Sequence, residues 1–508
     1  MIRTNTMELI AKLHQESLED VASVHDQPKI QSIAKQAEAS YTKIVGSTVE
    51  DDVGNFIPCK ISDFLDVESL PSPYRAQGVG ENIFVSNSET VLLDIVSHTK
   101  HETVSREFLR GGPRKAILHD PRKAKPAIVT CGGLCPGLNT VIREIYMCLK
   151  YTYGVREVYG VPFGFRGFYE PEYEIKPLTD EEVDDIHHDG GSYLGSSRGG
   201  HSTRMIVDAI VDFGFNMVFV IGGDGSHRGA IKVFDELRSR KLPYAVIGIP
   251  KTVDNDIALI DRSFGFATAV EEAQRAIKSA KTEATSYFNG IGLVKLMGRH
   301  SGHITMAATV ASRDVDVCLI PEVPFVLEGE KGLIAHIRKV LHRKGHCVVV
   351  VAEGAGMHIE SEIKNETDAS GNMRLPDVGL WLKEHITNSL RQDEVTLKYI
   401  DPTYMIRTVP PNAADNLYCA MLAQNAVHGA FAGYTPLLTA VILCLRIYRN
   451  DSGFTVGLIR THYVYIPMEV ISQGRMEVDV ESRSWEEVML TTGQPNFEEA
   501  VPVSAAAT

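Results

Sequence analysis

Two short apolar runs, each leading into a polar segment that contains charged residues, constrain the fold of this chain more than any other feature. The first, Met217 to Ile221, is rich in β-branched residues and leads into Gly222-Gly223-Asp224-Gly225-Ser226. The second, Tyr244 to Ile249, leads into Lys251 and then Asp254-Asn255-Asp256. Such runs are typical of strands buried on both faces of a parallel sheet. Because parallel strands end at the same edge of the sheet, where open α/β folds bind ligands, we expect three carboxylates and one cation to meet there.

This combination of side chains suits phosphoryl transfer. A metal neutralises phosphate charge, a cation stabilises the transferring group and a carboxylate accepts the proton of the nucleophile. Glycines at a strand end also let a backbone approach a phosphate at the following helix N-terminus. In the alternative interpretation, Asp254 and Asp256 are turn residues and Asp224 is a helix cap. The presence of both segments favours the phosphate site.

Composition narrows the class of protein further. The chain has 508 residues, of which 44% are hydrophobic, so it can bury a large core and form more than one lobe. A formal net charge of -14 disfavours nonspecific nucleic-acid binding and favours a small phosphorylated ligand. The eight cysteines form no CxxC pair, and we interpret Cys131 and Cys135 as reduced packing residues. The N-terminus has no apolar signal-peptide region, which predicts a cytoplasmic protein without a membrane partner.

From residue 127 onward, strand-like and helix-like segments alternate. This pattern predicts two doubly wound, Rossmann-like α/β lobes with the active site in the cleft between them, preceded by an N-terminal extension that is partly mobile and partly packed. Besides the two runs above, the predicted strands are 127–130, 157–161, 291–297, 317–321 and 347–352, and the predicted helices are 140–150, 203–213, 266–285, 302–312 and 332–343.

Several further segments carry candidate binding residues. The turn Cys131 to Asn139 is a glycine-rich entry to a helix and suits a nucleotide phosphate, but a tight turn without a ligand has the same pattern. Arg198, in the loop GSSRGG, can reach phosphoryl charge or lie on the surface. Lys295, Met297 and Arg299 alternate at a strand end, where the two cations suggest an anion site and Met297 suggests core packing.

Two more candidates lie near the predicted second lobe. Glu353 ends an apolar run and offers acceptors to a hydroxyl-rich ligand such as a sugar. The segment Lys398 to Arg407 contains two cations and two phenols, which suit a sugar phosphate or an ordinary surface. We interpret His300 and His303 as structural residues, because no third metal ligand lies nearby.

Five of these segments together carry a family resemblance. GGDGSHRGA, PKTVDND, KLMGRHSG, CGGLCPGLNT and KYIDPTYMIR occur in the order of the 6-phosphofructokinase family, and the chain resembles its plant-type and kinetoplastid-type branch from about residue 128 to 465. The resemblance implies a glycolytic enzyme that transfers the γ-phosphate of ATP to the 1-hydroxyl of fructose 6-phosphate. It also implies Mg²⁺ as cofactor and an allosteric homo-oligomer, a tetramer.

The resemblance assigns roles residue by residue. It makes Asp254 the base, places Thr252, Lys251 and Arg198 beside the transferring phosphate, and gives Asp224 and Asp256 to magnesium. The implied nucleotide contacts are Gly132, Arg198, Gly223, Asp224, Gly225 and Ser226. The implied sugar-phosphate contacts are Thr252, Asp254, Asp256, Met297, Gly298, Arg299, Glu353, Tyr404 and Arg407.

Two positions bear on the phosphoryl donor. Pyrophosphate-using relatives have aspartate at the place of Gly225, where a side chain crowds and repels a nucleotide α-phosphate. Lysine at the place of Lys251 is typical of those same relatives, but the pair of glycine and lysine is typical of the plant-type ATP branch, so ATP is predicted. A pyrophosphate-dependent enzyme, a NAD or lipid kinase with a similar glycine turn, and a noncatalytic regulatory subunit are the alternatives.

The chain departs from the family pattern in three places. Gly290 replaces an arginine of bacterial relatives that reaches the neighbouring subunit, and Asn412 to Asn416 replace a basic cluster. Pro436 to Ser452 is an insert, which we interpret as a retained or mispredicted coding segment or a surface hairpin. The implied domains are a 1–124 extension, a 125–265 nucleotide-binding lobe completed by 421–475, a 266–420 sugar-phosphate-binding lobe, the 436–452 insert and a 476–508 tail.

Overall fold

The structure is a computed structural model, and it describes most of the chain from residue 107 onward. The described residues are 60, 62, 67–74, 83–93, 107–197, 199, 201–356, 376–434, 454–459, 461–468, 471 and 474–497. Arg198, the insert Pro436 to Ser452 and the first 59 residues of the predicted extension lie outside them. The two main sheets belong almost entirely to one compact unit, made of Ile57–Val91, Phe108–Leu437 and Asn450–Thr508.

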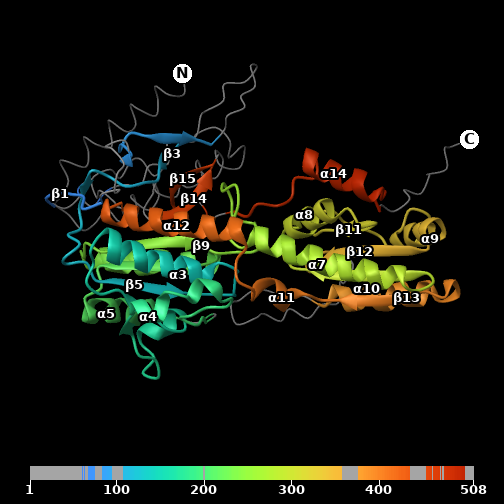
Figure 1. Cartoon of the computed structure of the whole chain (residues 1–508), viewed down its shortest axis with the longest axis horizontal. Helices are drawn as coiled ribbons and strands as arrows, with labels where there is room; N and C mark the ends of the chain where they lie inside the picture. Colours follow the sequence, from blue (N-terminus) through green and yellow to red (C-terminus); the bar gives the residue numbers. More distant parts are fainter. Residues whose placement is uncertain are drawn as a thin grey trace, which may run out of the picture. The chain divides into compact units, whose positions relative to one another are not determined.

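A nine-stranded sheet forms the larger part of this unit (Figure 1). Its central strands are parallel, whereas β15 and β7 run antiparallel to their neighbours and β3 is antiparallel to β15. In spatial order the strands are β2 (Thr90–Leu92), β3 (Glu107–Arg110), β15 (His462–Pro467), β14 (Phe454–Ile459), β9 (Ala245–Pro250), β8 (Met217–Gly222), β5 (Pro126–Thr130), β6 (Tyr159–Val161) and β7 (Lys176–Pro177).

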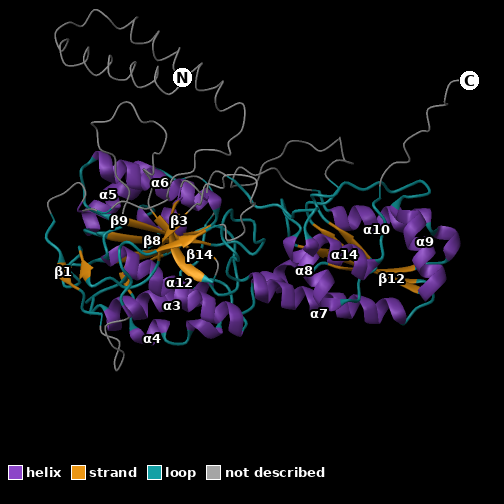
Figure 2. Ribbon diagram, turned by 90° about the horizontal axis from the view of Figure 1, so that it is seen from above, coloured by secondary structure: helices purple, strands orange, loops and turns teal. Residues whose placement is uncertain are grey.

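Helices cover both faces of this sheet. Alternate residues of β8 point to opposite faces, as strand geometry requires. Val218 and Val220 pack with α5 (Thr203–Phe213) and α6 (Asp224–Ser239), whereas Phe219 and Ile221 pack with α3 (Leu138–Met147) and α12 (Ala413–Phe431). The two helix pairs lie on opposite sides of the strands in Figure 2. A strand with both faces buried explains the unbroken apolar run in the sequence.

A second sheet has four strands, all parallel, in the order β11 (Val317–Leu319), β12 (His346–Ala352), β10 (Gly290–Leu296) and β13 (Thr396–Ile400). Its faces are covered by α7 (Phe266–Thr285) and α8 (His303–Ser312) on one side and by α9 (Leu333–Lys344) and α10 (Val378–Ser389) on the other. The predicted doubly wound α/β class is therefore confirmed. The predicted helices 203–213 and 266–285 match α5 and α7 residue for residue, and the other predicted elements are displaced at their ends by a few residues.

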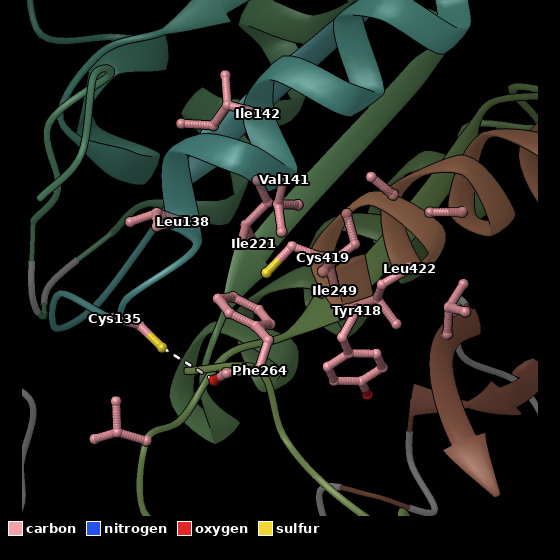
Figure 3. Close-up of a cluster of buried hydrophobic side chains, with 14 of the residues drawn as sticks. Cys135, Leu138, Val141, Ile142, Ile221, Ile249, Phe264, Tyr418, Cys419 and Leu422 are labelled. Carbon is pink, nitrogen blue, oxygen red and sulfur yellow. Dashed lines mark hydrogen bonds between the residues drawn. The ribbon is translucent and has the colours of Figure 1, made fainter. Parts of the chain in front are cut away.

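One apolar cluster packs the glycine-rich turn Cys131 to Asn139 against the elements around it (Figure 3). Leu138 and Val141 of α3 pack with Tyr418 and Leu422 of α12 and with Ile221 at the end of β8. Cys135 lies at the edge of this cluster, and its thiol donates a hydrogen bond to the carbonyl oxygen of Phe264 at 3.2 Å. Cys131 and Cys135 are buried free thiols, in agreement with their interpretation as packing residues.

Lys295 of β10 has a role different from the anion site suggested by the sequence. Its ammonium group lies 3.1 Å from Asp377 and 2.8 Å from Asp401, and its side chain is only 12% exposed. Burial by itself lowers the pKa of this lysine, but the hydrogen bonds to Asp401 and Asp377 outweigh burial and raise the pKa above its usual value. Asp377 is the N-cap of α10 and Asp401 follows β13, so Lys295 holds the start of α10 and the end of β13 to β10.

We expect Lys295→Met to destabilise the protein by about 1–3 kcal/mol, because it leaves two partly buried carboxylates without their shared cation. Urea unfolding measures this change. Lys398→Met is the matched control, since Lys398 is 40% exposed and, among the residues that the structure describes, forms an ion pair only with Glu283, at 3.9 Å. Equal loss of stability in both variants would contradict the role assigned to Lys295.

Candidate active site

The end of β8 places a helix N-terminus directly at the edge of the large sheet. Gly222 ends the strand, Gly223 is the N-cap of α6, and Asp224 lies in the first turn of that helix. A Cβ atom on Gly222 would lie 2.4 Å from the side chain of Ser226, so only glycine fits there. The first N–H groups of a helix have no carbonyl partner within the helix and favour anions. The turn therefore has the form expected for a phosphate site.

The neighbouring strand β9 delivers the second segment to the same edge. The Lys251 N–H donates to the Gly222 carbonyl at 2.9 Å, which aligns the two strand ends. Thr252 Oγ1 donates to Asp256 Oδ1 at 3.0 Å and accepts from the Asp254 N–H at 3.2 Å, so the turn is closed by its own side chains. Asn255 adopts a left-handed backbone conformation with φ of 57° and accepts a hydrogen bond from the Ser263 N–H at 2.8 Å.

The glycine-rich turn Cys131 to Asn139 contacts these two strand ends. Lys251 is buried, and its ammonium group donates to the carbonyl oxygen of Gly133. Gly132 has a φ of 86°, a conformation that favours glycine, and its N–H donates to the Ser197 carbonyl at 3.1 Å. Ser196 Oγ donates to the Gly132 carbonyl at 2.6 Å, so the loop that precedes Arg198 lies against this turn. Three segments distant in sequence thus meet at one edge of the sheet.

Asp254 is the most perturbed carboxyl group of the site. Burial, together with the negative charges of Asp256 and Glu353, raises its pKa to about 8. Its Oδ1 atom is buried and has no hydrogen-bond partner among the described residues. The backbone at Asp254 is fixed, because Ser301 Oγ donates to its carbonyl oxygen at 3.1 Å. A carboxyl group held in place, with one oxygen unpaired and a raised pKa, has the properties of a general base.

Asp224 and Asp256 face a shared cation that the sequence analysis did not identify. Nε of Arg475 lies 3.3 Å from Oδ2 of Asp224 and 4.0 Å from Oδ2 of Asp256. Burial and the charge of Asp224 raise the pKa of Asp256. Arg475 follows the last strand of the sheet in a segment without strand or helix periodicity, so no sequence signal indicated its place.

The carboxylate oxygens of Asp224 and Asp256 are suitable ligands for magnesium. The described part of the chain contains no group of three or more histidine, cysteine or acidic residues that could hold a metal. Magnesium is usually bound by one or two carboxylates together with substrate phosphates and water. Two carboxylates that already converge on one positive charge fit a metal delivered with a polyphosphate.

Apart from Thr252, Asp254 and Asp256, the candidate sugar-phosphate residues form two groups. In the first, Met297, Gly298 and Arg299 follow β10, and Glu353 follows β12. The Gly354 N–H donates to the Gly298 carbonyl at 3.1 Å, which holds the two strand ends together. Nε and Nη2 of Arg299 are buried and lack partners among the described residues. Burial raises the pKa of Glu353, although the charge of Arg299 opposes this shift. Met297 packs partly against the core.

The second group lies on α11 (Thr403–Arg407). The Arg407 guanidinium lies 4.9 Å from the centre of the Tyr404 ring, and Tyr404 is 71% exposed. Nε of Arg407 is buried and has no hydrogen-bond partner in the described part of the chain. Within the described residues, no hydrogen bond or ion pair joins these two side chains to Asp254 or its neighbours. The structure therefore brings together the first group with Asp254 but does not link the second group to it.

Strand ends that carry glycine turns, a lysine and paired carboxylates are typical of α/β proteins that bind and transfer phosphoryl groups. The model of the family described as Phosphofructokinase matches residues 125–430. The chain belongs to the phosphofructokinase family.

Similar proteins agree with this assignment. ATP-dependent 6-phosphofructokinase 1 of Arabidopsis thaliana is 50% identical over 449 residues, which cover 87% of this chain and 91% of the relative. ATP-dependent 6-phosphofructokinase 4, chloroplastic, of the same plant is 49% identical over 442 residues, covering 85% and 79%. The crystal structure of a pyrophosphate-dependent phosphofructokinase from Marinobacter aquaeolei has a TM-score of 0.58 and 19% identity, covering 73% of this chain and 92% of that one. This likeness shows the shared fold.

Proposed function

We propose that this protein transfers the γ-phosphate of ATP to the 1-hydroxyl of fructose 6-phosphate, giving fructose 1,6-bisphosphate. The observation that carries the proposal is the buried Asp254 carboxyl group with an unpaired oxygen and a raised pKa, beside a carboxylate pair and a glycine turn. The identity of about 50% to plant ATP-dependent enzymes over most of both chains supports the same activity.

In this proposal Asp254 accepts the proton of the sugar hydroxyl as the oxygen attacks the γ-phosphorus of ATP, and the bond from that phosphorus to the bridging oxygen breaks so that ADP leaves. Asp224 and Asp256 would hold Mg²⁺, which supplies charge neutralisation of the phosphates when bound. Lys251 and Thr252 lie beside the phosphate, with Gly132, Gly223, Gly225, Ser226 and the undescribed Arg198 around the nucleotide. Arg299 is the strongest candidate for a sugar-phosphate contact, because two of its buried nitrogens have no hydrogen-bond partner within the described segments. Met297, Gly298, Glu353, Tyr404 and Arg407 complete the proposed sugar-phosphate side.

The domain boundaries, the tetramer and the cytoplasmic location also belong to the proposal. The division into a nucleotide-binding lobe and a sugar-phosphate-binding lobe is supported by the separation of β5 to β9 and β14 from β10 to β13 into two sheets. No helix among the described residues combines the length and apolar character needed to cross a bilayer. The compartment stays a prediction, since one similar plant relative is named as chloroplastic.

The test is phosphorylation of fructose 6-phosphate by the purified chain with Mg²⁺, with ATP and pyrophosphate supplied in parallel. We expect turnover with ATP and none with pyrophosphate. Turnover with pyrophosphate alone would favour the pyrophosphate-dependent alternative. A folded protein that binds fructose 6-phosphate but turns over neither donor would favour the regulatory alternative, although Asp224, Asp254 and Asp256 are all present.

A further inference from the structure

Arg475 is anchored by its backbone to the turn that carries the proposed catalytic residues. The segment around it forms an antiparallel bridge between Arg475 and Ile257, and the Met476 N–H donates to the Asp256 carbonyl at 2.9 Å. Two residues later the Val478 N–H donates to Oε1 of Glu322 at 2.8 Å. The position of Arg475 is therefore fixed by main-chain contacts that do not depend on its side chain.

The Arg475 side chain lies among carboxylates. Its Nε is closest to Oδ2 of Asp224, at 3.3 Å, and lies 4.0 Å from Oδ2 of Asp256. Its positive charge also opposes the increase in the pKa of Asp254 that burial causes. Nearby, burial and then the charges of Arg475 and Arg299 lower the pKa of His300 to about 4, so this histidine is neutral at pH 7. Among the described residues, Arg475 is the cation that forms ion pairs with both Asp224 and Asp256.

A guanidinium that hydrogen-bonds a carboxylate oxygen leaves that oxygen a further lone pair, but its positive charge repels a metal ion bound there. Magnesium requires oxygen ligands at roughly 2.0–2.1 Å in octahedral geometry. Arg475 is already paired with Oδ2 of Asp224 at 3.3 Å and lies 4.0 Å from Oδ2 of Asp256, so a bare divalent ion must bind against the repulsion of a like charge or move the guanidinium aside. When the metal arrives bound to a polyphosphate, the negative phosphate oxygens offer the displaced guanidinium a new partner.

We propose that Arg475 is a specificity-determining residue that makes the Asp224–Asp256 pair select a metal–polyphosphate complex over the bare metal ion. In the free enzyme its guanidinium group serves as the counter-ion of these two carboxylates, while its backbone stays anchored to the turn that carries them. The backbone bridge to Ile257 keeps the displaced guanidinium within reach of the incoming phosphates. This inference rests on the proposed function, in which the two aspartates hold the metal.

The test is Mn²⁺ binding, followed by electron paramagnetic resonance at low ionic strength, with and without a nonhydrolysable ATP analogue. We expect Arg475→Gln to bind Mn²⁺ alone roughly tenfold more tightly than the wild type, because a like charge a few ångströms away is gone. The tightening of Mn²⁺ binding that the analogue causes should become smaller in the same variant. Arg475→Lys, which keeps the charge, should stay near the wild type.

Arg483→Gln is the matched control for net charge, since Arg483 is an exposed residue at the start of α14 (Arg483–Thr492). It should leave Mn²⁺ affinity unchanged. Asp256→Asn should abolish Mn²⁺ binding. If Asp256→Asn does so but Arg475→Gln binds Mn²⁺ no more tightly than the wild type, the role of Arg475 is refuted and the proposed metal pair stands. If neither the wild type nor any variant binds Mn²⁺ even with the analogue, the role of Arg475 and the proposed metal pair are both refuted.

Discussion

Replacement of Asp254 by asparagine is expected to lower kcat by about 100- to 10,000-fold, with little change in KM for fructose 6-phosphate. Asparagine keeps the size of the side chain but cannot accept the proton of the sugar hydroxyl. Because this proton transfer occurs in the transition state, the loss should appear in kcat rather than in substrate binding. Steady-state kinetics with ATP and Mg²⁺ measures the change.

The same substitution should stabilise the free protein. The pKa of Asp254 is about 8 when folded and near 3.8 when unfolded, so between these values the folded state binds more protons. The contribution of this group to the free energy of unfolding is therefore fully present below about pH 4 and is lost as the pH rises to about 8. We expect the melting temperature of Asp254→Asn to exceed that of the wild type by a few degrees at pH 8, with the gain vanishing near pH 4.

Asp261→Asn is the matched control, because it removes an exposed carboxylate from the same loop. It should change neither kcat nor the pH dependence of stability. An Asp254→Asn enzyme that keeps wild-type kcat would remove Asp254 from the role of base. A variant that loses activity and also melts below the wild type at pH 8 would contradict the buried carboxylate with a raised pKa described here.

Replacement of Gly225 by aspartate is expected to lower kcat/KM for ATP by at least about 100-fold. The added carboxylate would crowd and repel the nucleotide α-phosphate, at a cost of roughly 3 kcal/mol in transition-state binding. The fold should tolerate the change, since a Cβ atom at Gly225 would meet only a guanidinium nitrogen of Arg228, at 3.9 Å. Kinetics with ATP and with pyrophosphate, together with the melting temperature, test this prediction.

Gly225→Asn separates the effect of charge from that of size, because asparagine has the shape of aspartate without its charge. We expect it to lose less ATP activity than Gly225→Asp. Equal loss in the two variants would show that crowding alone decides. Unchanged kcat/KM for ATP in both would mean that Gly225 does not face the nucleotide.

Much of the fold could be predicted from the sequence because local patterns dictate it. The continuous apolar run of β8 requires burial on both faces, and the periodicity of residues 266–285 specifies α7 from its first residue to its last. The adjacent strand ends followed from the same patterns, since consecutive parallel strands present their carboxyl ends at one edge. For this reason Asp224, Lys251 and Asp256 could be assigned to one site before any contact was known.

Contacts between segments far apart in the sequence could not be predicted in this way. Lys295 was expected to face an anion, but the structure places it between Asp377 and Asp401, which belong to other segments. Arg475 belongs to a stretch without periodicity, and only its bridge to Ile257 brings it to Asp224 and Asp256. The sequence by itself determined the strands, the helices and the residue types at the sheet edge, because hydrophobic periodicity acts locally. Only the tertiary structure decided which charges neutralise one another, because ion pairing depends on distances in space.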